Sequence, residues 1–146
     1  MGPAFALRSS TPSQSTCGEP VRVLIVEDSP LVQKMYGLVF TRREHELTSV
    51  KNGLEALNVL DRSDTPYDLI LLDLRMPDMD GVQFIREVRT NPAAAKVPIV
   101  LTTAEPEDSV LMIQARALGV AGVVRKPWKP QDLRDLVRVI LKRAVA

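Results

Sequence analysis

Short apolar runs recur along the chain from Val21 onwards, and each one favours a β-strand. Apolar residues fill consecutive positions in these runs rather than alternate ones, which is typical of strands covered on both faces of a sheet. Polar or turn-forming residues bound each run. The runs are VRVLIVE (21–27), ELTSV (46–50), YDLILLD (67–73), VPIVLTT (97–103) and AGVVRK (121–126), of which ELTSV is the weakest.

After each run, apolar residues recur at the spacing of an α-helix. The first helical segment has Ser29 as its N-cap and Pro30 at the favoured first position, and it extends to about Arg43. One face of this segment is expected to carry Leu31, Met35, Leu38 and Val39.

Four further helical segments complete the pattern. Their expected inward residues are Leu54, Leu57 and Leu60 in GLEALNVLDRS, then Val82, Ile85 and Val88 in 81–89, and Leu133, Leu136, Val137, Ile140 and Leu141 in 131–143. The fourth segment, 107–118, ends against Gly119, a favoured residue after a helix. Five β–α units with buried strands predict an α/β fold, a doubly wound parallel sheet with helices on both faces.

The first twenty residues lack any hydrophobic period. They contain six Ser or Thr and three Pro, so we interpret 1–20 as a flexible N-terminal extension and 21–146 as one domain. The chain has 146 residues, 45% of them apolar, which is enough for a single core.

The charge balance gives no argument for binding nucleic acid or an anionic membrane. Lys and Arg number 19 against 18 Asp and Glu. The apolar runs are far shorter than the roughly 20 residues of a membrane span. The single cysteine, Cys17, has no partner in the chain for a disulfide, so a reduced, cytoplasmic protein is the simplest interpretation. In the last helix, Arg134, Arg138 and Lys142 form a basic stripe, which we interpret as a solvated face, with a docking surface as the alternative.

Polar residues gather where the predicted strands end. In a doubly wound sheet, ligands bind beyond the carboxyl ends of the strands, at the point where strand order reverses. The first strand ends in Glu27 and Asp28, the third in Asp73, the fourth in Thr102 and Thr103, and the fifth in Lys126. Each such end taken singly also suits a strand that simply reaches solvent. Together they place three carboxylates, a hydroxyl and an ammonium at one edge.

These groups suit phosphoryl transfer. Three carboxylates in one cleft repel one another, and oxygen ligands of this kind favour Mg²⁺. An aspartate can act as a nucleophile toward phosphorus, while a metal, a lysine and a hydroxyl stabilise charge on the transferred group. The residues themselves therefore indicate that Asp73 is a phosphoryl acceptor.

The motifs VEDS, DLRMPDMDG, LTTA and RKP occur in this order, and in them the chain resembles the receiver domain of two-component response regulators, the CheY-like family. The resemblance extends from about Val21 to Ala144 and implies the strand order 2-1-3-4-5. It implies that a histidine kinase or phosphotransfer protein phosphorylates Asp73 and that a downstream protein receives the signal. It also implies Mg²⁺ bound by Asp28, Asp73 and the backbone carbonyl of Arg75, with Glu27 holding metal-bound waters.

The resemblance assigns further roles at the same edge. Thr103 matches the hydroxyl that swings toward the phosphoryl group, with Thr102 as an alternative one residue away. Lys126 matches the lysine that bridges to the phosphoryl oxygens, and the Lys126–Pro127 bond matches a cis peptide. Val123 is a departure, because the family has Tyr or Phe there and the rotation of that ring reports on the threonine.

Arg75 and Glu105 each lie two residues beyond a key position and carry opposite charges. We expect them to lie at the mouth of the site and to pair as a gate across the path of attacking water. Trp128 is expected to pack partly beside the last helix.

Specific residues bear on three rival functions. A phosphatase of the haloacid-dehalogenase type needs an aspartate two positions after its nucleophile, where this chain has Arg75. A flavodoxin-like protein needs a Ser, Thr or Gly-rich loop after the first strand, and EDSPLV is not one. A receiver-fold scaffold that acts without phosphorylation stays open, because Val123 favours it while the complete acid set opposes it. Both a stand-alone regulator and a receiver within a longer protein also remain open.

Overall fold

In the computed structural model, residues 19–76 and 78–145 are described. Within them, strands and helices alternate along the chain as the sequence predicts. They are β1 (Val21–Val26), α2 (Pro30–Val39), β2 (His45–Val50), α3 (Gly53–Arg62), β3 (Leu69–Leu72), α4 (Gly81–Thr90), β4 (Ile99–Thr103), α5 (Val110–Leu118), β5 (Gly122–Arg125) and α6 (Pro130–Val145).

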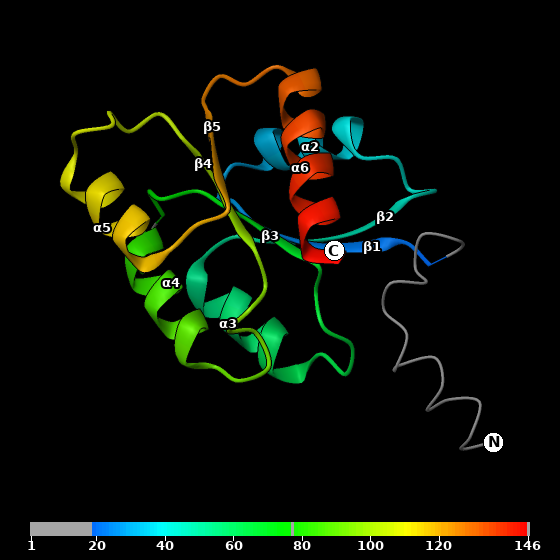
Figure 1. Cartoon of the computed structure of the whole chain (residues 1–146), viewed down its shortest axis with the longest axis horizontal. Helices are drawn as coiled ribbons and strands as arrows, with labels where there is room; N and C mark the ends of the chain where they lie inside the picture. Colours follow the sequence, from blue (N-terminus) through cyan, green and yellow to red (C-terminus); the bar gives the residue numbers. More distant parts are fainter. Residues whose placement is uncertain (1–18, 77, 146) are drawn as a thin grey trace.

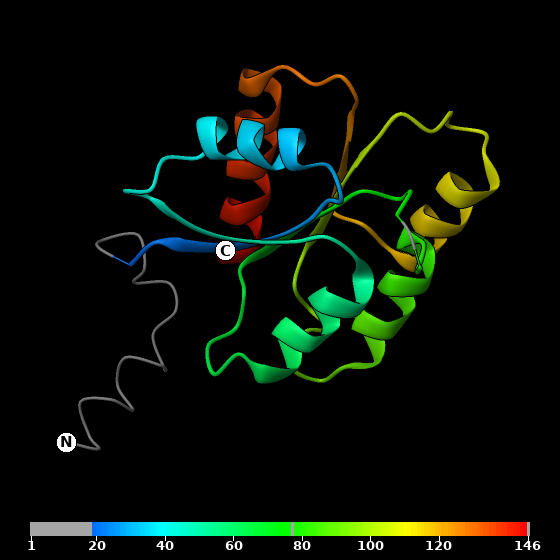
Figure 2. The same ribbon diagram turned by 180° about the vertical axis from the view of Figure 1, so that it is seen from behind.

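The strands form one parallel sheet in the order β2-β1-β3-β4-β5. Helices α2 and α6 cover one face, and α3, α4 and α5 cover the other (Figures 1 and 2). The predicted doubly wound fold and strand order are confirmed. Strand order reverses between β1 and β3, so their carboxyl ends flank the expected ligand site.

Two apolar clusters fill the layers on either side of the sheet. Along β1, Leu24 and Val26 join the cluster under α3, α4 and α5, whereas Val23 and Ile25 join the cluster under α2 and α6. All four side chains are fully buried. Burial on both faces explains the continuous apolar runs, since successive strand residues point to opposite sides.

The expected apolar face of α2 is wrong for three of its four residues, and only Val39 is buried as predicted. Leu31 is 68% exposed and Leu38 is 82% exposed, and Met35 is exposed beside them, whereas Tyr36 and Val39 are the buried residues. The row that contains Tyr36 and Val39 faces the sheet because the Tyr36 ring reaches across to β4, where its hydroxyl donates to Thr102.

The predicted end of this helix is also wrong. It ends at Val39 rather than near Arg43, because Phe40 has extended backbone dihedral angles and a buried ring. Residues Thr41 to Glu44 then form the turn into β2.

The inward stripe predicted for α3 needs a similar correction. Leu54 is 53% exposed and Leu57 is only partly buried, while Leu60 is buried as expected. Gly53 and Ala56 occupy the rest of the buried face, since small residues let the helix lie close to the sheet. The stripes of α4 and α6 are confirmed: Val82, Ile85, Val88, Leu133, Val137 and Ile140 are buried, and Leu136 and Leu141 pack partly against the core.

Capping side chains determine where two of the later helices begin. Ser109 accepts a hydrogen bond from Met112, so α5 starts at Val110 rather than near Glu107. Asp80 accepts one from Gln83 and caps α4. Gly119 terminates α5 with a φ of 94°, a conformation that favours glycine.

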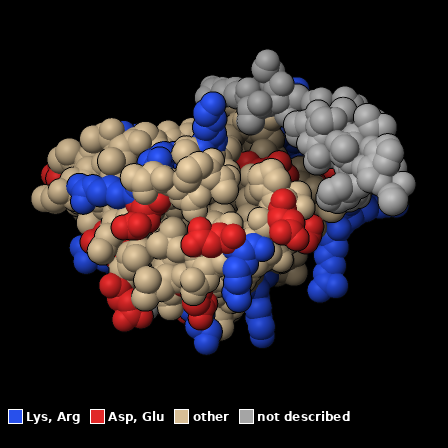
Figure 3. All heavy atoms as spheres, turned by 90° about the horizontal axis from the view of Figure 1, so that it is seen from below, with Lys and Arg blue, Asp and Glu red and all other residues tan. Residues whose placement is uncertain are grey.

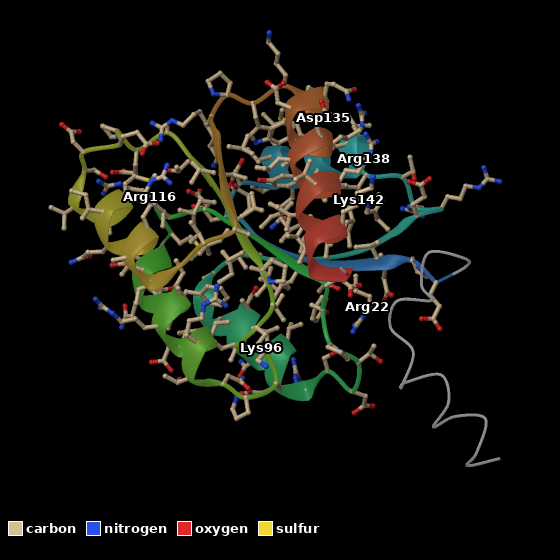
Figure 4. The ribbon with its side chains drawn as sticks, in the orientation of Figure 1. Arg22, Lys96, Arg116, Asp135, Arg138 and Lys142 are labelled. Atoms are coloured by element: carbon tan, nitrogen blue, oxygen red, sulfur yellow. The ribbon has the colours of Figure 1, made fainter. Side chains whose placement is uncertain are left out.

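The basic stripe on α6 has two different parts. Arg138 and Lys142 are exposed, and Arg138 pairs with Asp135 at 3.5 Å along the helix (Figure 4). Arg134 is partly buried and donates to the backbone oxygen of Val39 at 3.0 Å, so it links α6 to α2. The solvated-face interpretation holds for Arg138 and Lys142 but not for Arg134.

The predicted extension 1–20 and Cys17 lie outside the described residues, apart from Glu19 and Pro20. Helices in the part of the chain that the structure describes lack the combined length and apolar character needed to cross a membrane. On the face shown in Figure 3, acidic and basic side chains are interspersed.

Gly81 should tolerate no larger residue. A Cβ there would lie 2.7 Å from Leu74 Cδ2 and 2.8 Å from Leu74 Cα, and the backbone atom cannot move away easily. We expect Gly81→Ala to lower the free energy of unfolding by about 1–3 kcal/mol in urea titrations. Gly37→Ala is the control, because its Cβ would meet no described atom within 4 Å; it should raise stability by about 0.5–1 kcal/mol. A Gly81→Ala protein as stable as wild type would contradict the packing argument.

Candidate functional site

Three carboxylates converge at the carboxyl edge of the sheet. One oxygen each from Glu27, Asp28 and Asp73 lies within 4.8 Å of the others. Glu27 is 2% exposed and Asp73 is 8% exposed, whereas Asp28 is open to solvent. The three meet because β1 and β3 are neighbours in the sheet and end at the same level, with the Asp73 amide donating to the Val26 oxygen at 3.1 Å.

Lys126 joins two of these carboxylates. Its Nζ lies 3.0 Å from Glu27 Oε1 and 3.1 Å from Asp73 Oδ2. Burial alone would lower the pKa of Lys126, but the nearby Asp73 and Glu27 carboxylates outweigh burial and raise it. Burial raises the pKa of Glu27, and the hydrogen bond from Lys126 offsets only part of that effect. The ammonium therefore stays charged and relieves the repulsion between the two acids.

Backbone and amide groups fix the acids in place. The Ser29 amide donates to Glu27 Oε2 at 3.2 Å, and the Arg75 amide donates to Asp73 Oδ1 at 3.1 Å. Gln33 Nε2 donates to the backbone oxygens of Glu27 at 2.6 Å and Val50 at 3.3 Å. Sequence reasoning missed Gln33, because a glutamine on a helix carries no signal of the two strand ends that it bridges.

The two threonines at the end of β4 make different contacts. Thr103 Oγ1 accepts from the Glu105 amide at 2.9 Å, and the Thr103 backbone oxygen accepts from the Lys126 amide at 2.9 Å. Thr102 Oγ1 instead accepts from the Tyr36 hydroxyl at 3.0 Å. Thr102 is thus engaged with α2, and Thr103 is the one tied to the loop over the site.

Arg75 and Glu105 form an ion pair at the mouth of the site, as expected. The hydrogen bond from Arg75 lowers the pKa of Glu105, and the same bond raises the pKa of Arg75. Arg75 is mostly exposed, so solvent screens the pair. An open cavity of about 570 Å³ adjoins it, lined by Asp28, Leu74, Arg75, Met76, Asp80 and Leu111.

The donor set suits a hard divalent cation. All three clustered side chains offer carboxylate oxygens, the ligands that Mg²⁺ prefers, and the exposed Asp28 borders the open cavity. Asp78 and Asp80 follow Asp73 closely in sequence but do not join this cluster, since Asp80 caps α4.

A family model described as the response regulator receiver domain matches residues 23–138. The chain belongs to this family. As a receiver domain it departs at Val123, which is partly buried and packs against the cluster under α3, α4 and α5. Receiver domains of this family are signalling domains that interact with histidine kinases.

Curated relatives agree with this assignment. The DNA-binding response regulator MtrA of Mycolicibacterium smegmatis is 35% identical over 122 residues, 84% of this chain and 51% of that protein. A probable chemotaxis protein CheY of Rhizobium etli is 28% identical over 123 residues, 84% of this chain and 93% of that protein. The chain spans 49% of another relative, the transcriptional regulatory protein ResD of Bacillus subtilis, at 30% identity. It therefore covers about half the length of two of these relatives.

Solved structures share the same fold. The receiver domain of a sensor histidine kinase from Pseudomonas aeruginosa superposes with a TM-score of 0.72 at 30% identity, covering 83% of this chain and 98% of that one. That structure contains a magnesium ion in its active-site cleft. The chemotaxis response regulator CheY4 of Vibrio cholerae gives a TM-score of 0.75 at 26% identity, with 83% and 98% covered.

Proposed function

We propose that Asp73 accepts a phosphoryl group from the phosphohistidine of a histidine kinase or phosphotransfer protein, in a Mg²⁺-dependent reaction. The observation that carries this proposal is the position of the Asp73 carboxylate. It stands at the end of the central strand, clustered with Glu27 and Asp28 and 3.1 Å from Lys126 Nζ. The magnesium ion in the related Pseudomonas receiver domain supports the same assignment.

The transfer is a displacement at phosphorus. An Asp73 oxygen attacks and forms an O–P bond while the N–P bond of the phosphohistidine breaks, and its electron pair leaves on the imidazole nitrogen. Asp28, Asp73 and the Arg75 carbonyl would hold Mg²⁺, with Glu27 bound to its waters, and the ion would neutralise charge on the transferred group.

Lys126 and Thr103 act on the product. Lys126 Nζ already contacts Asp73 and would move from Glu27 to a phosphoryl oxygen. Thr103 lies at the neighbouring strand end, where its hydroxyl would turn from the Glu105 amide to another phosphoryl oxygen. Both changes make new contacts only when the phosphoryl group is present. They supply the differential interaction that a conformational signal needs.

The receiving partner is a protein in this proposal, and the setting is cytoplasmic. Lys and Arg number 19 against 18 Asp and Glu, and both signs are interspersed on the face in Figure 3. In the basic stripe of α6, Arg134 bonds to the Val39 oxygen and Arg138 pairs with Asp135, which leaves little of the stripe for phosphate contacts. The alternative, a receiver-fold scaffold that signals without phosphorylation, rests on Val123 alone and is opposed by the assembled carboxylate cluster and Lys126.

A small phosphodonor tests the proposal directly. Incubation with acetyl phosphate and Mg²⁺ should raise the intact mass by one phosphoryl group, and EDTA should prevent the gain. If the mass stays unchanged with Mg²⁺ and excess donor, the proposed phosphoacceptor function is wrong and the scaffold hypothesis is supported.

The Arg75–Glu105 ion pair should control the lifetime of the phosphoryl group. In the proposed gate, the pair lies across the path of attacking water, so Arg75→Ala with Glu105→Ala should speed dephosphorylation severalfold, the scale of about 1 kcal/mol in the barrier. The measurement is loss of the phosphoryl mass after the donor is removed. Asp135→Ala with Arg138→Ala removes an ion pair on α6 and is the matched control. Equal lifetimes in the gate variant and wild type would exclude the gate.

A further inference from the structure

Tyr36 and Trp128 form a buried aromatic pair next to the site. Their ring centroids lie 5.1 Å apart at an interplanar angle of 23°, a stacked arrangement. Tyr36 is 1% exposed and Trp128 is 9% exposed. We call the pair, with the bond from the Tyr36 hydroxyl to Thr102, the Tyr36–Trp128 stack.

Each member of this stack lies on a segment that also carries a group of the phosphoryl site. Tyr36 belongs to α2, which follows Glu27 and Asp28 and is tied to Glu27 through Gln33. Trp128 comes two residues after Lys126, and Thr102 directly precedes Thr103. The stack therefore joins, at a second point, three segments that meet at the carboxylate cluster.

The stack lies on the face of the sheet opposite Val123. Tyr36 and Trp128 belong to the cluster under α2 and α6, whereas Val123 packs against the cluster under α3, α4 and α5. Other members of the family have an aromatic ring at the Val123 position, and this chain has an aliphatic side chain there. The aromatic pair of this chain lies on the opposite face of the sheet, under α2 and α6.

We propose that the Tyr36–Trp128 stack transmits the phosphorylation of Asp73 to helices α2 and α6. Lys126, which moves when Asp73 is phosphorylated, is the link between the site and the stack. This proposal rests on the proposed function, because a phosphoryl group on Asp73 is what draws Lys126 away from Glu27. The backbone amide of Lys126 donates a hydrogen bond to the backbone oxygen of Thr103. When the Lys126 side chain moves, the segment from Lys126 to Trp128 is therefore strained.

Because the core is closely packed, that strain moves the Trp128 ring to a different position. Interiors are packed about as densely as organic crystals, so rings move between discrete positions rather than by gradual deformation. Leu133 and Val137 of α6 lie in the same cluster as the stack, and Arg134 of α6 bonds the Val39 oxygen at the end of α2. A new position of the Trp128 ring is thereby transmitted to both helices, which lie side by side in Figures 1 and 2.

Trp128 is the single tryptophan of the chain, so intrinsic fluorescence reports on this ring alone. With Mg²⁺ present from the start, acetyl phosphate should change the Trp128 emission at the same rate as the intact mass rises. Asp73→Asn should show neither change. A full mass gain with unchanged emission would overturn the relay and leave the phosphoacceptor function standing. No mass gain in wild type would overturn both.

Hydrogen exchange tests whether the signal reaches the helices. Phosphorylation should alter amide exchange in α2 and in the first turns of α6 of wild type, and Trp128→Leu should accept the phosphoryl group but lose that difference. Tyr36→Phe keeps the ring and removes only the hydrogen bond to Thr102. It is therefore a second test that remains available if Trp128→Leu does not fold. The exchange difference on phosphorylation should be smaller in Tyr36→Phe than in wild type.

Tyr67→Phe is the matched control. It removes the hydroxyl of another buried tyrosine, which donates to Thr48 at 3.1 Å, and the variant should respond as wild type does. If Tyr36→Phe keeps the full exchange difference, the stack is structural and the relay is excluded.

Discussion

Asp73→Asn protein incubated with Mg²⁺ and acetyl phosphate is expected to keep its intact mass, whereas wild type gains one phosphoryl group. The substitution preserves the shape of the side chain but replaces the anionic oxygen with an amide that is a poor nucleophile. The amide can still accept a hydrogen bond from Lys126, and Lys126 keeps its contact with Glu27, so the fold should persist. Intact mass spectrometry after a fixed incubation gives the answer.

Asp80→Asn is the matched control for this experiment. Asp80 also lines the cavity, but its side chain caps α4, and asparagine is an equally good N-cap. The control should gain the phosphoryl group as wild type does. A phosphoryl group on any other residue of the Asp73→Asn protein would show that Asp73 is not the sole acceptor.

Saturating Mg²⁺ is expected to raise the melting temperature of wild type by roughly 5–11 °C. A ligand that binds only the folded state adds about 2.7 kcal/mol at a hundred times its Kd, and a domain of this size gains about 2–4 °C per kcal/mol. The expected site is the carboxylate cluster, whose oxygens lie within 4.8 Å of one another. Asp28→Asn should remove most of this gain because it deletes a direct ligand.

The same substitution should leave the metal-free protein within about 0.5 kcal/mol of wild type. Asp28 is exposed, and Lys126 already relieves the repulsion between Glu27 and Asp73, so little strain is left to release. Thermal melts of both proteins in EDTA and in Mg²⁺ measure these effects. An equal Mg²⁺ shift in both proteins would place the metal elsewhere. A metal-free Asp28→Asn protein that is clearly destabilised would give Asp28 a structural role.

The chain of amino acids by itself determined the architecture of this protein. Residues buried on both faces of a sheet must be apolar at consecutive positions, so β1, β3 and β4 could be located from their composition alone. The carboxyl ends of parallel strands meet at one edge, and with β1 and β3 as neighbours this rule brings Glu27, Asp28 and Asp73 together, as the structure shows. The pairing of Arg75 with Glu105 was also predictable, since both follow strand ends at this edge and carry opposite charges.

Tertiary packing decided which side of a helix is buried. In α2, helical spacing marks Leu31, Met35 and Leu38 as one row, yet a helix has several such rows and the periodicity does not say which one faces the sheet. The row with Tyr36 was selected because its hydroxyl finds Thr102 and its ring finds Trp128, residues 66 and 92 positions away in the chain. Contacts of such sequence separation leave no local pattern.

The electrostatic arrangement of the site was likewise a tertiary result. Lys126 could be assigned to the edge from its strand end, but its simultaneous contacts at 3.0 Å to Glu27 and 3.1 Å to Asp73 depend on how far β5 lies from β1 across the sheet. Gln33 bridges the ends of β1 and β2 for the same kind of reason. The sequence determines which groups arrive at the edge, because strand ends are set by local composition. Only the packing of the helices on the sheet decides which of those groups touch, because that distance depends on side chains far apart in the chain.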